Sequence, residues 1–186
     1  RKESCKIAYQ KRTPGGQWSE PLAIAKTPSP TGYVHYGANI LFDREGALHV
    51  TFHMYHGDPV RSDIQGYLRS VDGGVSWTKS DGAVVELPAT EETCEVFLRS
   101  EDGWLRGGQS SAIDPEGRFY VLVTDQQIRL NSLYRLEGPG VWKCIDLRPQ
   151  IDRFYPGFSS AQEGTITFDT QGRLYVCLDV KEPSAG

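Results

Sequence analysis

Three histidines flank one expected β-hairpin, and their types and spacing are suited to proton transfer. His35 precedes a short apolar strand at 40–42, while His53 and His56 end the strand that leaves the turn at 43–46. Antiparallel pairing returns the end of the second strand toward the start of the first, so we expect His35 to lie near His53 or His56. A neutral imidazole can remove a proton, and a protonated one can donate a proton or neutralise a carboxylate. The sequence therefore predicts a proton-transfer site at this end of the hairpin.

Two further hairpins place polar residues at the corresponding strand ends, where the adjoining strands are apolar. The candidate catalytic residues are His35, His56, Tyr55 and Arg106. The candidate substrate-binding residues are Tyr36, Asn39, His53, Gln109, Asp125, Glu163 and Asp179. Polar residues gathered at one end of repeated strands are what a binding site requires. Any water-filled channel mouth would have the same character, and the sequence alone leaves both interpretations open.

The three hairpins share a turn with the pattern Asp-x-x-Gly, at 43–46, 114–117 and 169–172. An apolar strand enters each turn and another leaves it. A Trp recurs between the hairpins, at Trp18, Trp77 and Trp142, and no segment has helical periodicity. Short strands that repeat every roughly 55–70 residues indicate the blades of a β-propeller. We therefore predict an all-β fold, a β-propeller of four-stranded blades.

About three blades' worth of strands are expected in this chain. Residues about 1–32 would hold strands C and D of a first blade, 33–92 a second blade and 104–148 a third, and 158–181 strands A and B of a fourth. Three blades do not close a ring, because propellers use about four or more. The chain is thus expected to belong to a six- or seven-bladed ring. Either a homodimer completes it or the chain is part of a longer protein.

The segment from Ser70 to Trp77 has the composition of a tight turn. The Asp72 carboxylate can accept hydrogen bonds from turn amides, and the glycines permit positive φ angles. Trp77 is expected to open the next strand and to pack its ring under the turn. The string resembles the Asp box, S-x-D-x-G-x-x-W, of sialidase-like proteins with bacterial neuraminidase repeats. The resemblance assigns Ser70, Asp72, Gly74 and Trp77 a structural role on the outer rim of a propeller, away from the site.

The hairpin from His35 to His56 is similar to a His-Asn…Asp-Gly…His hairpin of neuraminidase-repeat propellers that include ulvan lyases and related polysaccharide lyases. In that subgroup, paired histidines at the channel mouth bind a uronate with a Tyr and an Arg and perform β-elimination. His35 and His56 occupy the two histidine positions of the motif. The resemblance implies an oligo- or polysaccharide partner and lyase chemistry on an anionic glycan.

Two other functions remain open. A sialidase-like exo-glycoside hydrolase needs three arginines around a carboxylate, a Tyr–Glu nucleophile pair and an Asp acid-base. Arg106, Glu163, and Asp125 or Asp179 would supply part of that set, while Arg69 is expected to face a neighbouring blade.

A non-catalytic glycan- or protein-binding propeller would instead use loop aromatics, for which the sequence offers Tyr33, Tyr36, Tyr55, Trp104, Phe154 and Tyr155. The segment 148–157 is expected to be a loop between blades.

Composition limits the other classes of partner. The 186 residues carry a net charge of −4, so no basic field indicates nucleic acid. No apolar run is long enough to cross a membrane. The four cysteines have no metal-ligand spacing and no cofactor motif is evident, although a structural calcium or zinc is left open. The first residues of this chain are not expected to be a signal peptide, and an extracellular or periplasmic location is favoured only by analogy.

Overall fold

The computed structural model describes residues 6–28, 32–36, 40–56, 61–100, 105–125 and 130–182. At some strand positions only the backbone is described and the side chain is not. These positions are Tyr36, Arg61, Ser62, 106–109, Leu130 and 160–163. Among the candidate site residues, Asn39 lies outside the described residues altogether. The side chains of Tyr36, Arg106, Gln109 and Glu163 also lie outside them, although their backbones belong to strands.

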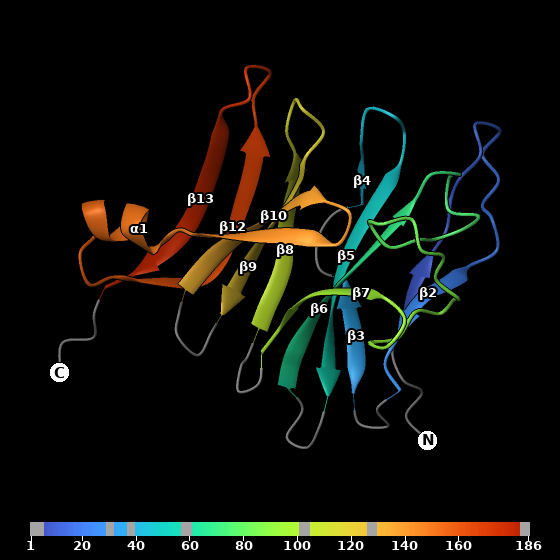
Figure 1. Cartoon of the computed structure of the whole chain (residues 1–186), viewed down its shortest axis with the longest axis horizontal. Helices are drawn as coiled ribbons and strands as arrows, with labels where there is room; N and C mark the ends of the chain where they lie inside the picture. The colour runs from blue at the N-terminus through green and yellow to red at the C-terminus, as the bar shows by residue number, and fades with distance from the viewer. Residues whose placement is uncertain are drawn as a thin grey trace.

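Four antiparallel sheets stand side by side along the molecule (Figure 1). The two-stranded first sheet contains β1 (Lys6–Tyr9) and β2 (Leu22–Lys26). The second has the order β3 (Tyr33–Tyr36), β5 (Leu48–His56), β6 (Arg61–Ser70) and β7 (Glu95–Arg99), with β4 (Leu41–Phe42) also paired to β5. The third contains β8 (Leu105–Ile113), β9 (Phe119–Asp125), β10 (Leu130–Gly138) and β11 (Val141–Asp146). The fourth contains β12 (Ser159–Phe168) and β13 (Leu174–Lys181).

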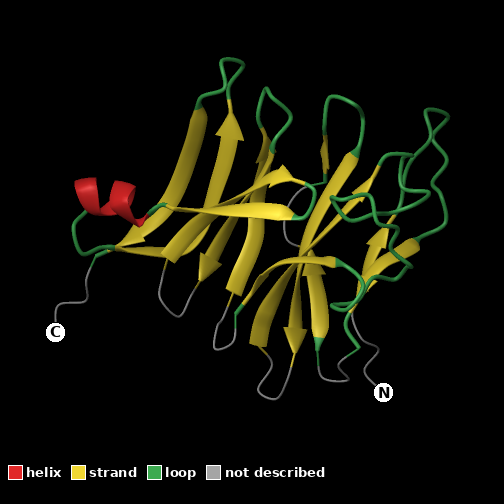
Figure 2. Ribbon diagram, in the orientation of Figure 1, coloured by secondary structure: helices red, strands yellow, loops and turns green. Residues whose placement is uncertain are grey.

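The three Asp-x-x-Gly turns lie together at the upper edge of the molecule (Figure 2). Each glycine has a positive φ, 82° at Gly46, 84° at Gly117 and 79° at Gly172, which favours glycine at these positions. Each turn is closed by the glycine N–H, which donates to the carbonyl of the Asp. Because all three turns lie at one edge, the opposite ends of these strands, which carry candidate site residues, lie at the other edge.

Three apolar clusters fill the spaces between neighbouring sheets. Strand alternation sorts β5 into two faces. Leu48, Val50, Phe52 and Met54 pack with Ile24 of β2 in the cluster between the first two sheets. The opposite face of β5 turns toward the third sheet, where the ring of His49 stacks on Phe119 of β9. This face is therefore the polar side of a blade interface.

A short helix, α1 (Arg148–Phe154), occupies the segment that the sequence led us to expect as a loop between blades. Pro149 in the first turn has a φ already suited to a helix, and the Ile151 side chain is buried. Because only one of its seven residues is buried, this segment has no helical periodicity, and the sequence could not predict the helix. The prediction of an all-β fold is otherwise confirmed.

The segment from Ser70 to Trp77 is a turn held by its own side chains. Asp72 accepts hydrogen bonds from the amides of Val75 and Ser76 and from the Ser76 hydroxyl, and these bonds lower the pKa of Asp72. The Trp77 ring is 1% exposed, and its Nε1–H donates to the Gly74 carbonyl at 3.2 Å. The expected strand from Trp77 is reduced to bridges of Thr78, because a glycine turn follows at 79–82.

We expect Gly74→Ala to lower the free energy of unfolding by about 2–4 kcal/mol. Gly74 has a φ of 87°, and a Cβ there would lie 2.3 Å from Cε1 of Tyr9. Gly73→Ala is the matched control, because Gly73 has a φ of 70° but its added Cβ would meet nothing closer than 4.0 Å. Denaturant unfolding of both variants separates the clash from the backbone strain. Equal losses would show that Tyr9 does not pack against this turn.

Candidate functional site

Strands β3 and β5 bring four aromatic side chains together, two from each strand. The register pairs Tyr33 with Tyr55 and His35 with His53. The Tyr33 and Tyr55 rings stack at 4.2 Å, and the His35 and His53 rings stack at 4.9 Å with planes 5° apart. The Tyr55 ring meets His53 edge-on at 5.0 Å. We call Tyr33, His35, His53 and Tyr55 the aromatic layer.

Exposure differs across the aromatic layer. Tyr33 and His35 are exposed, Tyr55 is half-buried and His53 is 5% exposed. His35 also borders a hollow of about 360 Å³ between β1 and β3, which Lys6 lines from the other side. The exposed imidazole of His35 therefore lies where a ligand can reach it, with the buried imidazole of His53 behind it.

His56 lies outside the aromatic layer. Its Nδ1 is 2.7 Å from Oδ1 of Asp63, and its Nε2 is 3.6 Å from Oε2 of Glu91. Arg99 contacts the same oxygen of Glu91 at 3.6 Å. The structure thus pairs His35 with His53. It places His56 in a separate group with Asp63, Glu91 and Arg99, which we call the His56 cluster. The sequence offered one signal for Asp63, its place seven residues after His56. Glu91 and Arg99 belong to a segment without a repeat pattern, so the sequence offered no signal for them.

The two aspartates among the candidates occupy separate places. Asp125, at the end of β9, lines a hollow of about 170 Å³ between the second and third sheets, together with Arg99 of β7. Asp179 is exposed on β13 of the last sheet. Asp125 is therefore the acid that the described structure places near the His56 cluster.

A second histidine cluster lies at the opposite end of the same blade interface. Nε2 of His49 is 3.0 Å from Oδ2 of Asp43, and Nδ1 of His49 is 2.7 Å from the Tyr67 hydroxyl. Arg69 also donates to Asp43, at 3.2 Å. Burial raises the pKa of Tyr67 and lowers that of His49. Burial alone would raise the pKa of Asp43, but hydrogen bonds from His49 and Ala47 lower it.

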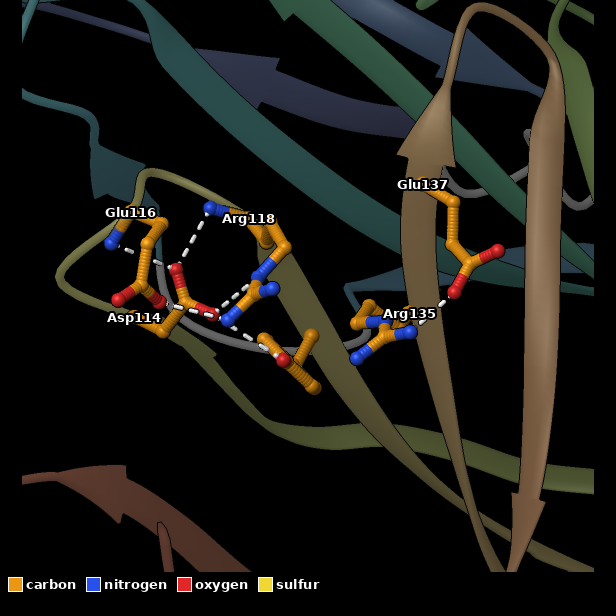
Figure 3. Close-up of polar contacts among 6 residues, drawn as sticks. Asp114, Glu116, Arg118, Arg135 and Glu137 are labelled. Atoms are coloured by element: carbon orange, nitrogen blue, oxygen red, sulfur yellow. Dashed lines mark hydrogen bonds and ion pairs between the residues drawn. The ribbon is translucent and has the colours of Figure 1, made fainter. Parts of the chain in front are cut away.

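The other two Asp-x-x-Gly turns show that this cluster has a structural counterpart in each hairpin. Oδ2 of Asp114 accepts from the Tyr120 hydroxyl at 3.1 Å, and Asp169 accepts from Tyr175 in the same way at 3.2 Å. Arg118 donates to Asp114 and to Glu116, each at 2.6 Å. Figure 3 shows these contacts and the separate pair of Arg135 with Glu137. His49 thus holds the position of the tyrosines and closes its own turn. Arg69 also bonds to this turn, through its contact with Asp43.

We expect the free energy of unfolding to fall as the pH is lowered from about 7 to about 5. The folded state holds His49 neutral because its pKa is lowered, whereas the unfolded chain takes up a proton near the ordinary value of 6.5. Proton uptake by the unfolded state therefore favours unfolding in this window, and the contribution of Asp43 is lost only at lower pH. Denaturant unfolding of the parent chain and His49→Gln at several pH values measures the slope. An unchanged slope in the variant would contradict this origin.

Metal and membrane features are limited in the part of the chain that the structure describes. No group of three His, Cys, Asp or Glu side chains there could hold a metal ion. No described helix is long and apolar enough to span a membrane.

Comparison with known families identifies the repeat pattern. The family model described as BNR repeat-containing family member matches residues 6–149, most of the chain. The chain belongs to this family. The suspected relationship to sialidase-like neuraminidase-repeat proteins is thereby confirmed. A comparison with curated proteins by sequence gives no match.

Two solved structures of an ulvan lyase of polysaccharide lyase family PL25 share the fold of this BNR repeat-containing chain. Each matches with a TM-score of 0.59 and 16% identity, over 78% of this chain and 39% of the lyase. One of them is bound to -[GlcA(1-4)Rha3S]-. The chain therefore spans about 39% of the length of that lyase. At this identity the likeness shows the fold, a segment of β-propeller.

Proposed function

We propose that this chain is part of a carbohydrate-active propeller that cleaves a uronate-containing, anionic polysaccharide by β-elimination. The observation that carries the proposal is the aromatic layer, in which an exposed imidazole lies on a buried imidazole beside two phenols. The fold is shared with an ulvan lyase, one structure of which is bound to a glucuronate-containing saccharide. These are the side-chain types that elimination requires at the mouth of a propeller channel.

The chemistry requires three roles. A cationic group neutralises the uronate carboxylate and makes the proton on C5 more acidic. A neutral base takes that proton, and the electrons of the C5–H bond form the C4=C5 double bond as the C4–O4 bond breaks. An acid then protonates the departing O4. The products are an unsaturated uronate and a saccharide with a free hydroxyl, and no water is consumed.

We assign proton removal to His35, because it is the exposed imidazole of the layer. We assign protonation of O4 to the Tyr55 hydroxyl. Neutralisation of the carboxylate is assigned to Arg106, because the ring nitrogens of His56 already face Asp63 and Glu91. The remaining contacts with the polysaccharide are assigned to Tyr36, Asn39, Gln109, Asp125, Glu163 and Asp179. His53 is 5% exposed, so its role is to support the His35 ring and not to touch the polysaccharide.

A glycan-binding module without catalysis is the second candidate. The stacked pair of Tyr33 and Tyr55 favours it, because 37% of Tyr33 is exposed and such a ring can pack on the face of a sugar. A sialidase-like hydrolase has less support, since Arg69 is paired with Asp43 in a turn.

The test incubates the chain with a panel of uronate-containing polysaccharides, sulfated and unsulfated, and records the ultraviolet absorbance of unsaturated uronate. We expect absorbance to rise with at least one member of the panel. Binding without any rise in absorbance would replace the lyase by the binding module. Release of fluorophore from a sialoside reporter would replace it by the hydrolase.

A further inference from the structure

Gln65 of β6 is a buried amide directly opposite His53. The register pairs His53 with Gln65, and the Gln65 side chain is 0% exposed. Neither its Oε1 nor its Nε2 has a hydrogen-bond partner among the described residues. Burying a polar amide is unfavourable unless it is hydrogen-bonded, and buried groups of this kind usually have a partner. Gln65 therefore needs an explanation beyond packing.

The next blade repeats the same arrangement. His53 is the tenth residue after Asp43 of its turn, and Thr124 is the tenth after Asp114. The cross-strand partner of Thr124 is Asn131, a second amide that is 0% exposed. The Thr124 hydroxyl donates a hydrogen bond to the amide oxygen of Asn131. Both blades thus place a buried polar pair at one position, where the third blade connects the two side chains directly.

In the second blade this position supports the aromatic layer. The ring of His53 is the surface on which the exposed ring of His35 stacks, at 4.9 Å and nearly parallel. The Tyr55 ring fixes His53 from a second direction by its edge-on contact. A change in the orientation of the His53 ring would therefore move both His35 and Tyr55.

We propose that Gln65 and His53 are positioning residues, a buried polar pair that sets the orientation of the His35 ring. The proposal rests on the proposed function for its kinetic consequences, but its geometry does not depend on lyase activity. The Gln65 amide lies across the strand pair from His53, at the position from which Asn131 bonds Thr124 in the next blade. His35 then meets the substrate with its ring already oriented, and little catalytic geometry has to form on binding.

The experiment compares Gln65→Met with Asn131→Leu. Each substitution replaces a buried amide by an apolar side chain of similar shape, and only the first lies beneath the aromatic layer. We expect both variants to lose some stability. We expect Gln65→Met alone to lower kcat about tenfold with little change in KM, because ring orientation and not substrate affinity is altered. His53→Phe retains a ring for stacking and should lower kcat similarly, without a further loss in the double variant.

NMR of the histidine rings provides a readout that does not need activity. We expect the ring resonances of His35 and His53 to shift in Gln65→Met and to be unchanged in Asn131→Leu. If the parent chain has no lyase activity but these shifts appear, the positioning role stands and the proposed function fails. If the rings do not shift, or both variants lower kcat equally, the positioning role is overturned.

Discussion

Trp77→Ala is expected to lower the free energy of unfolding by about 3–5 kcal/mol, the range found when a large buried aromatic is removed from a core. Trp77 is 1% exposed within the cluster between the first and second sheets. It meets Tyr9 edge-on at 5.5 Å and donates to the Gly74 carbonyl. The substitution therefore removes packing from two sheets and a hydrogen bond from the turn. Denaturant unfolding with the slope held in common measures the loss.

Trp18→Ala is the matched control, because the Trp18 side chain is 65% exposed. We expect this variant to change the free energy of unfolding by less than about 1 kcal/mol. A similarly small loss for Trp77→Ala would contradict the packing of this ring between the sheets. The comparison distinguishes two tryptophans that recur at equivalent intervals in the sequence but differ in burial.

The repeated turns made the fold predictable from sequence. An Asp followed three residues later by Gly limits the backbone conformations strongly, because the carboxylate accepts turn amides and the glycine takes a positive φ. Asp114 accepts from the amides of Glu116 and Arg118, and Asp169 accepts from the corresponding amides of Gln171 and Arg173. Such contacts lie within a few residues of one another, so the local sequence contains them.

The arrangement within the site was less predictable, because it depends on which face each side chain occupies. The sequence placed His35 near His53 or His56, and alternation along β5 decides between them. His53 shares a face with His35, whereas a register shift between Met54 and Tyr55 accompanies the contact of His56 with Asp63. A bulge of this kind redirects side chains, and nothing in the local residue types locates it.

Long-range partners were beyond sequence reasoning for the same reason. Glu91 reaches His56 from a segment with no repeat pattern, and Gln65 meets His53 only through the pairing of β5 with β6. The helix α1 depends on one buried residue, Ile151, and on a proline in its first turn. Each of these features depends on tertiary packing, and the periodicity of strands in the sequence carries no information about such contacts.

His35→Ala is expected to lower the rate of uronate elimination at least about 100-fold, the lower end of the contribution of a positioned general base. His35 is an exposed side chain, so its loss should leave the thermal unfolding midpoint nearly unchanged. Lys143→Ala, an exposed change on β11 of the next blade, is the control for both measurements.

The combination of results decides what His35 does. A large loss of rate at unchanged stability requires a chemical role, because a surface imidazole contributes little to folding. A loss of rate that accompanies a fall in the unfolding midpoint would instead assign His35 to the packing of the aromatic layer, through its stack with His53. An unchanged rate would remove His35 from the reaction. The base would then have to be sought at His56, whose ring nitrogens face the carboxylates of Asp63 and Glu91.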